Sequence, residues 1–353
     1  MRVAIIGTRG IPNEYGGYEQ LATYLAEGLV DRGHKVVVYN SSQHTQRYQK
    51  YKGVEMVYRW DPEKLFKSAS QFIYDLLCIR HLKANRPDVI LNLGYTSSTI
   101  WKDFFPKAVP VVTHMDGLEW QRSKYTTRVQ RFLQKAEKWA VQMSEVCISD
   151  NPEITSYLQA KFSIQPIEIA YGAKAVKPTA ALPNQLYDLL MARLEPENNI
   201  ETIIKAVLES NSEIPLKIVG KHNRFGQQLQ MKYPQKQIQF LGGIYNQQEV
   251  EKLRQQARIY FHGHSVGGTN PSLLEAMASG CCIYANSNPF NRAVLKSNAC
   301  YFKDYIELAQ QVDLYPSIDW KSCIDSNLLS IEQNYQWESI INQYEKMLLA
   351  LIE

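Results

Sequence analysis

The sequence predicts an α/β protein composed of two doubly wound domains, each a parallel sheet with helices on both faces. Short apolar runs typical of buried strands alternate with amphipathic helical stretches along most of the chain. Residues 172–185 interrupt this alternation with two prolines and no apolar period, as a linker does. The length of 353 residues also matches two domains of ~100–200 residues each.

The first domain begins with the apolar run Val3–Gly7, which ends in glycine as a buried strand does before a turn. A helix is predicted over Glu19–Asp31 because its leucines share one stripe, and Gly33 stops it before the strand Lys35–Asn40. A strand, a helix and a strand at this spacing predict a βαβ unit and therefore a parallel sheet. The domain continues through strands at Val54–Tyr58, Asp88–Leu93, Val109–Thr113 and Glu145–Ser149 and helices at Ser70–Ala84 and Thr127–Ser144.

The second domain repeats this plan after the linker. Its predicted strands are Tyr187–Met191, Leu216–Val219, Gln239–Leu241, Ile259–His262 and Cys282–Ala285. Its predicted helices are Ile200–Leu208, Gln247–Gln256 and Pro271–Ser279. A helical pattern over Ile331–Ile352 ends the chain, so we expect domains at 1–174 and 175–330 and a terminal segment at 331–353.

Composition restricts the class of protein. The formal net charge of +4 is mild and does not indicate nucleic acid, whose binders usually concentrate basic residues on one face. The six cysteines are scattered without CxxC or Cys/His ligand spacing, which argues against zinc and favours a reducing compartment. The first apolar run is too short for a signal peptide, and no stretch approaches the ~20 apolar residues of a membrane-spanning helix. We therefore expect a cytoplasmic protein, either soluble or peripheral on the inner face of the plasma membrane.

A glycine-rich loop follows the first predicted strand. Residues 7–17 (GTRGIPNEYGG) lie where doubly wound sheets bind ligands, outside the carboxyl ends of the strands. Gly16 and Gly17 allow the backbone to approach a ligand, and the helix that follows offers unpaired N–H groups to phosphate. The alternative is a flexible structural turn, since the dinucleotide fingerprint GxGxxG is absent.

The strongest motif is His262–Gly280 (HGHSVGGTNPSLLEAMASG), which begins where a predicted strand ends. Its glycines form a tight turn, its Thr-Asn pair suits a helix N-cap, and Pro271 suits the first helical position. The motif therefore predicts an anion cradle with a carboxylate one turn into the helix; the alternative is a capped helix with a solvated acid. The residues expected to contact a ligand are Gly267, Gly268, Thr269, Asn270 and Glu275.

Two further strand ends carry polar residues. Arg193 follows the first strand of the second domain and can bridge two phosphate oxygens with its planar guanidinium; the alternative is a surface ion pair. His114, Asp116 and Glu119 follow the strand Val109–Thr113 and are candidate acid–base or sugar-binding groups. A lone histidine is more often structural, and the clustering of three polar residues favours function.

Four segments together resemble the retaining GT-B glycosyltransferases of family four. More closely, they resemble the bacterial rhamnosyltransferase branch that assembles cell-wall and capsular polysaccharides. The segments are GTRGIPNEYGGYE at 7–19, DGLEWQRSKY at 116–125, ARLEPENNI at 192–200 and HGHSVGGTNPSLLEAM at 262–277. The resemblance covers essentially the whole chain.

The resemblance implies two domains facing a central cleft. The first would bind the acceptor and the second the nucleotide sugar, and the terminal helix with Trp337 would cross back onto the first domain. Arg193 is expected at the diphosphate and Glu275 at the ribose hydroxyls. His114 is expected at the donor sugar, and the loop with Gly16 and Gly17 at the donor phosphate.

Two positions depart from the family pattern. Gly267 stands where the first glutamate of the E-x7-E motif would be, and Asn198 stands where the family usually has lysine. Neutralisation of the diphosphate then depends on Arg193, on backbone amides and on Lys221, for which a solvated lysine is an equal alternative.

The expected reaction moves a hexose from a nucleoside diphosphate to an acceptor hydroxyl with retention of configuration. The expected donor is dTDP-L-rhamnose, and the expected acceptor is a saccharide or a polyprenyl-diphosphate-linked saccharide. No Asp-x-Asp pair is present to hold a divalent metal, so a metal-independent site without cofactor is expected. The alternatives are a non-catalytic nucleotide-sugar binding protein and a GT-B nucleotide-sugar epimerase.

A basic stripe on one predicted helix suggests an anionic membrane surface as a further partner. Arg128, Arg131, Lys135 and Lys138 share one face, while Val129, Phe132, Leu133, Ala136 and Ala140 can pack on the sheet. Nearby, Trp101, Lys102, Phe104, Phe105 and Lys107 have the composition of an interfacial anchor. The alternative is a solvated helix face.

Overall fold

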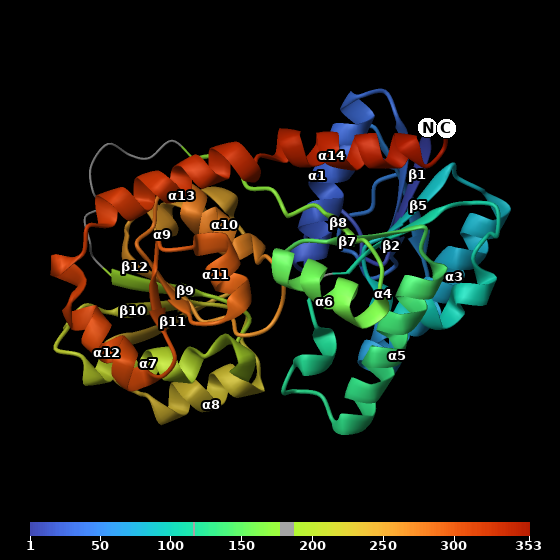
Figure 1. The fold of residues 1–353 in the computed structure, drawn as a ribbon. Helices are drawn as coiled ribbons and strands as arrows, with labels where there is room; N and C mark the ends of the chain where they lie inside the picture. Colours follow the sequence, from blue (N-terminus) through green and yellow to red (C-terminus); the bar gives the residue numbers. More distant parts are fainter. Residues whose placement is uncertain (116, 177–186) are drawn as a thin grey trace. The chain divides into compact units, whose positions relative to one another are not determined.

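The computed structural model describes residues 1–115, 117–176 and 187–353, and it divides into two compact α/β units. The first unit comprises Met1–Gln121, Tyr125–Gly172 and Trp337–Glu353. The second comprises Arg122–Lys124 and Ala173–Gln336. Each unit has one sheet of predominantly parallel strands (Figure 1), which confirms the predicted fold class. Most of the predicted linker, residues 177–185, lies outside the described residues.

The first sheet has the strand order β3-β4-β2-β1-β5-β6-β7-β8, and only the pairing of β3 with β4 is antiparallel. Its strands are β1 (Arg2–Ile6), β2 (Lys35–Ser41), β3 (Lys50–Tyr51), β4 (Val54–Arg59), β5 (Val89–Asn92), β6 (Val111–His114), β7 (Val146–Ser149) and β8 (Ile167–Glu168). Its helices are α1 (Gly17–Asp31), α2 (Glu63–Phe66), α3 (Ser70–Ala84), α4 (Tyr95–Ser98), α5 (Thr127–Met143), α6 (Pro152–Phe162) and α14 (Trp337–Ala350).

Successive side chains of a strand point to opposite faces of the sheet, so a strand that is apolar throughout needs cover on both faces. Ala4 and Ile6 of β1 join a core cluster with Tyr74 and Ile79 of α3. The alternate residues of β1 are also fully buried. A buried apolar strand of this kind needs a helix on each side, and α1 and α3 supply them in a doubly wound arrangement.

The second sheet has the order β11-β10-β9-β12-β13-β14. Its strands are β9 (Tyr187–Met191), β10 (Leu216–Val219), β11 (Ile238–Gly242), β12 (Ala257–His262), β13 (Ile283–Asn286) and β14 (Cys300–Phe302). Its helices are α7 (Ile200–Glu209), α8 (Arg224–Lys232), α9 (Gln247–Gln255), α10 (Pro271–Ala278), α11 (Pro289–Leu295), α12 (Tyr305–Asp313) and α13 (Trp320–Asn334). Helices α7 and α12 pack on one face of the sheet, with α9 and α10 on the other (Figure 1).

Two of the points at which the chain passes from one unit to the other, after Gly172 and before Trp337, are adjacent. Ala173 forms an isolated parallel bridge with Gln336 and donates its N–H to the carbonyl of Tyr335 at 2.6 Å. The prediction of a single helix over 331–352 is therefore wrong, because residues 335–336 interrupt the helical conformation between α13 and α14. Trp337, the first residue of α14, stacks on Tyr24 of α1 with ring centroids 4.2 Å apart. The terminal helix thus returns to the first unit, as expected.

Candidate functional site

Four loops meet at the carboxyl edge of the second sheet, after β9, β10, β12 and β13. Asparagine side chains connect these loops by donating to backbone carbonyls. Nδ2 of Asn198 donates to Arg193 O at 2.7 Å, that of Asn199 to Gly263 O at 2.8 Å, that of Asn223 to Leu194 O at 2.7 Å and that of Asn288 to His264 O at 2.9 Å. These hydrogen bonds between loops hold the edge in one arrangement without a ligand. The carboxyl edge of a doubly wound sheet is also the place where such sheets bind nucleotides.

Arg193 lies two residues beyond β9, and its side chain is exposed at this edge. Its carbonyl is the acceptor for Asn198, whose own side chain is buried. The structure therefore gives Asn198, an expected donor-binding residue, a supporting position behind the arginine. Lys221, two residues beyond the neighbouring strand β10, is also exposed.

The helix α10 begins as the sequence predicts. Oδ1 of Asn270 accepts from Ser272 N at 2.9 Å, Pro271 occupies the first turn and Thr269 is buried. Gly267 has a φ of 125°, and a Cβ built there meets no atom within 4 Å. The position therefore has room for a side chain, but its backbone conformation favours glycine. Gly267, expected from the resemblance to depart from the E-x7-E motif, thus stands at a position whose backbone favours glycine.

Glu275 does not stand alone on α10. Its Oε2 accepts from the guanidinium of Arg254, a residue of α9 that is almost fully buried. Burial lowers the pKa of Arg254, but the charges of Glu275, Tyr260 and Cys281 together leave it above its ordinary value. The carboxylate is therefore oriented by a buried cation, with its side chain 22% exposed. Arg254 could not be selected from sequence, because it lies on a different helix.

Two histidines at the end of β12 form a stacked pair. The rings of His262 and His264 lie 4.5 Å apart with an interplanar angle of 18°. Both nitrogens of His262 and Nδ1 of His264 are buried, and they have no hydrogen-bond partner among the described residues. Burial lowers the pKa of His262 to about 3. Burial, followed by the charges of His262, Arg193 and Arg122, holds the pKa of His264 well below its ordinary value.

Both imidazoles are therefore neutral near pH 7, and each offers one donor and one acceptor. Neither was selected as an individual site residue, although the motif 262–280 contains both. The signal in the sequence was a His-Gly-His run at a predicted strand end. The influence of Arg193 on His264 shows that the loops after β9 and β12 contribute to one electrostatic environment.

Acidic residues of the β9–α7 loop bind the short segment Arg122–Lys124, which belongs to the second unit. Lys124 Nζ lies 3.1 Å from Glu195 Oε2, and an Arg122 guanidinium nitrogen lies 3.6 Å from Glu197 Oε1. Burial raises the pKa of Glu195, while Arg193 and Lys124 lower it to a value below the ordinary one. The loop that carries Arg193 therefore also carries two acidic residues, which pair with the basic residues Arg122 and Lys124.

In the first unit, His114 ends β6 and is completely buried. Its ring lies edge-on to Tyr18 at 5.8 Å and 5.5 Å from the ring of Tyr171, and neither nitrogen has a hydrogen-bond partner among the described residues. Burial lowers its pKa to about 3, so the ring is neutral and carries no positive charge at neutral pH. Glu119 opens the short 3₁₀ turn η3 (Glu119–Gln121), and Asp116 lies outside the described residues.

The glycine-rich loop of the first unit is internally braced. Asn13 Oδ1 accepts from the backbone N–H groups of Tyr15 and Gly16, both at 3.1 Å. Glu19 Oε1 accepts from Arg9 N at 3.0 Å. Gly16 caps α1 and Gly17 begins it, with no side-chain cap. That this helix N-terminus faces a phosphate stays a prediction.

Within the described parts of the chain, no three His, Cys, Asp or Glu side chains gather as they would around a metal ion. No helix among the same residues is long and apolar enough to cross a membrane.

Two family models match successive parts of the chain. Residues 176–315 match the family described as "Glycosyl transferases group 1". Residues 1–174 match a "Domain of unknown function (DUF1972)". A search of curated proteins finds no match.

Several solved structures share the fold over nearly the full length of the chain. A sucrose-phosphate synthase from Thermosynechococcus elongatus has a TM-score of 0.82 at 17% identity, over 99% of this chain and 98% of that one. Anabaena HepE in complex with UDP-glucose has a TM-score of 0.77 at 14% identity, over 99% of each chain. A glycosyltransferase from Rickettsia africae has a TM-score of 0.70 at 12% identity, over 100% of this chain and 98% of that one. At these identities the likeness establishes the GT-B fold.

Proposed function

We propose that the protein is a retaining rhamnosyltransferase, on the premise that residues 176–315 match the group 1 glycosyl transferases and that the chain has a GT-B fold. It would transfer L-rhamnose from dTDP-L-rhamnose to a saccharide or polyprenyl-diphosphate-linked acceptor in bacterial surface polysaccharide assembly. The choice of sugar is supported by the four sequence segments that resemble the rhamnosyltransferase branch.

The observation that carries the proposal is the group of loops at the carboxyl edge of the second sheet. Exposed Arg193 follows strand β9, and the half-buried His264 and the capped N-terminus of α10 follow the adjacent strand β12. As the sugar departs, negative charge develops on the diphosphate. An arginine and oriented N–H groups that are fixed in advance stabilise that charge without reorganising.

The same edge suggests how the donor would be oriented. Arg193 would contact the diphosphate and Glu275, held by Arg254, would accept from ribose hydroxyls. His114, neutral and buried in the first unit, would contact a sugar hydroxyl. We propose that these groups operate without a metal ion, because cationic side chains and helix amides supply the positive charge.

The test is a panel of donors with the purified full-length chain. Calorimetry should show dTDP-L-rhamnose binding more tightly than dTDP-glucose and UDP-glucose, and product analysis should show retained configuration. UDP-glucose belongs in the panel because HepE was solved with it. Tight binding of UDP-glucose without binding of dTDP-L-rhamnose would contradict the donor assignment.

Gly267 favours a second candidate, a nucleotide-sugar binding protein without transfer activity, because the family carboxylate is absent there. A GT-B epimerase is a third candidate. Product analysis separates them: transfer gives a new glycoside, epimerisation gives an isomeric nucleotide sugar, and binding alone leaves the donor unchanged.

We also propose that the enzyme associates with anionic membrane through α5. The four basic residues of its stripe are all exposed. Glu137, the acid of the same segment, is buried and bonds to Lys161 at 2.6 Å, so it does not neutralise the stripe. Two aromatic residues of the proposed membrane anchor after β5 are not available to lipid. Phe105 is buried, and the indole of Trp101 donates to Phe72 O. Phe104 is the exposed aromatic residue that remains of this anchor.

A further inference from the structure

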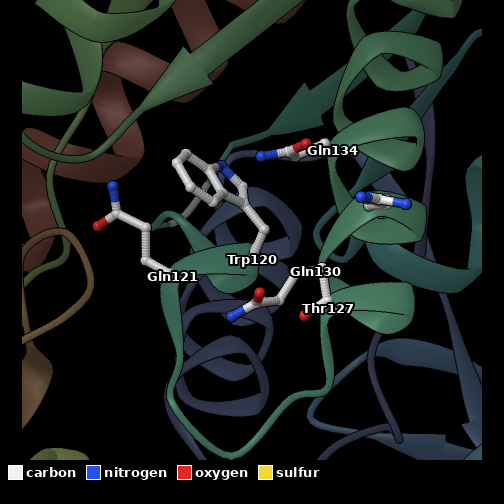
Figure 2. A pocket seen from close by; sticks show the side chains of 6 residues that line it. Trp120, Gln121, Thr127, Gln130 and Gln134 are labelled. Carbon is white, nitrogen blue, oxygen red and sulfur yellow. The ribbon is translucent and has the colours of Figure 1, made fainter.

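A polar cavity of about 440 Å³ opens on the first unit between η3 and the amino-terminal half of α5 (Figure 2). This volume is within the ~300–1,000 Å³ range of small-molecule sites. The residues that line it are Trp120, Gln121, Thr127, Gln130, Arg131 and Gln134. Gln130 and Gln134 are one helical turn apart on α5, and Figure 2 shows Gln134 extending toward the Trp120 indole.

The chemistry of the lining selects a class of ligand. Three of the six side chains are glutamine amides, and a hydroxyl lines the cavity at Thr127. Each amide both donates and accepts hydrogen bonds, as does each hydroxyl of a polyol. Carboxylates are absent from the lining, and Arg131 is its one charged residue. This lining suits an uncharged, hydroxyl-rich molecule better than a phosphate or a cation.

The aromatic member of the lining is fixed in place. Lys161 of α6 lies 5.5 Å from the centre of the Trp120 ring, and the same ammonium is bound by the buried Glu137 at 2.6 Å. Trp120 Nε1 is buried, with no hydrogen-bond partner among the described residues. An oriented indole supplies an apolar surface for the C–H groups of a pyranose ring beside amides that bind its hydroxyls.

We infer that this cavity is a saccharide-binding subsite that receives a neutral sugar unit of the acceptor. The inference rests on the proposed function, because a glycosyltransferase needs an acceptor site and the donor-site candidates Arg193, His264 and Glu275 lie in the second unit. Trp120 provides the platform, and Gln130 and Gln134 read the hydroxyl pattern. Arg131, the charged residue of the lining, is exposed to solvent.

Saturation-transfer NMR with the full-length chain tests the subsite directly. The probes are methyl glycosides of a neutral hexose, a 6-deoxyhexose and an N-acetylhexosamine, together with short oligosaccharides, all without nucleotide. At least one saccharide should receive magnetisation from the wild type. The double substitution Gln130→Ala and Gln134→Ala should weaken its binding at least tenfold, and Trp120→Phe should weaken it to a smaller extent.

Gln142→Ala is the matched control, because Gln142 is an exposed glutamine on the same helix that does not line the cavity. It should bind like the wild type. Circular dichroism establishes that the double variant keeps its fold, and calorimetry with dTDP should give an unchanged dissociation constant. No transfer to any saccharide, or equal transfer in the double variant and the wild type, would overturn the subsite. Failure of the wild type to bind any nucleotide sugar would instead count against the proposed function, with the saccharide result standing separately.

Discussion

Diphosphate binding at the carboxyl edge of the second sheet should depend on Arg193. Arg193→Ala removes a charge-assisted contact worth about 1.5–3 kcal/mol, so affinity for dTDP should fall about 10- to 150-fold. Calorimetry measures the change, and dTMP should lose less because it has one phosphate fewer. Lys236→Ala removes an exposed cation of the same unit and is the control. Equal dTDP affinities of the Arg193→Ala variant and the wild type would remove this face as the donor site.

Buried neutral histidines predict how stability depends on pH. With a folded-state pKa of about 3 and an ordinary value of 6.5, His114 is protonated only on unfolding between these pH values. Its stabilising contribution is therefore complete above pH 6.5 and is lost as pH falls toward 3, at about 1.4 kcal/mol per pH unit. Buried Asp75, with a pKa raised to about 7, acts in the opposite direction in the same unit.

The difference between a variant and the wild type isolates the histidine. His114→Gln should add about 1.4 kcal/mol of stability per unit of acidification, relative to the wild type, between pH 6.5 and 4.5. Urea unfolding at several pH values measures this slope, which is independent of the cost of the substitution itself. The exposed His222 provides a matched substitution, His222→Gln, in the second unit. Parallel pH profiles for the His114→Gln variant and the wild type would show that the ring is protonated in the fold.

At the scale of single elements, α5 carries both the proposed membrane contact and the saccharide cavity. Anionic lipid attracts basic residues by about 1 kcal/mol each, so the chain should float with anionic vesicles at low salt and dissociate as salt rises. Reversing Arg128, Arg131, Lys135 and Lys138 to glutamate should abolish flotation.

Reversal of four exposed lysines of the second unit produces the same change in net charge and serves as the control. These lysines are Lys236, Lys252, Lys296 and Lys321. If this control floats no better than the α5 variant, the attraction depends on total charge and the α5 assignment is wrong.

The bounds of helices were predicted well where apolar residues recur with a strong helical period. The helix predicted at Ser70–Ala84 has these bounds in the structure. The one predicted at Thr127–Ser144 ends one residue earlier. Val129, expected to pack on the sheet, is 38% exposed because the helix begins only two residues before it. The helix Pro152–Phe162 was not predicted, although Asn151 caps it and Pro152 begins it.

Parts of the site depend on tertiary contacts that no local pattern encodes. The start of α10 could be predicted from the glycines, Asn270 and Pro271, because helix capping depends on local sequence. The pairing of Glu275 with Arg254 joins two helices, and the turn of Asn198 toward Arg193 depends on the loop conformation. Sequence alone therefore located the loops but not the way their side chains share hydrogen bonds.

At the scale of the whole molecule, Trp337 anchors the returning chain to the first unit. It is 9% exposed, stacks on Tyr24, and lies so close to Gly172 that a Cβ there would be 2.4 Å from its ring. Trp337→Ala should destabilise the first unit by about 3–5 kcal/mol through cavity formation. The second unit should unfold as in the wild type, because Trp337 belongs to the first unit.

Calorimetric unfolding with and without dTDP separates the two transitions. The control is Trp60→Ala, which removes an indole of the same unit that is 55% exposed. If both tryptophan variants lower the first transition equally, the stacked contact is not an anchor.

The paired crossing has a consequence for how this protein can be rearranged. Because the chain leaves the first unit at Gly172 and re-enters it beside that point at Trp337, residues 173–336 form an insertion that contains all of the second unit except Arg122–Lys124. A short glycine–serine linker can join residue 172 to residue 337, because the neighbouring residues Ala173 and Gln336 already lie side by side in a parallel bridge. The first unit should then fold without this insertion, and insertions from other chains can be exchanged at the same seam without cutting a strand of either sheet.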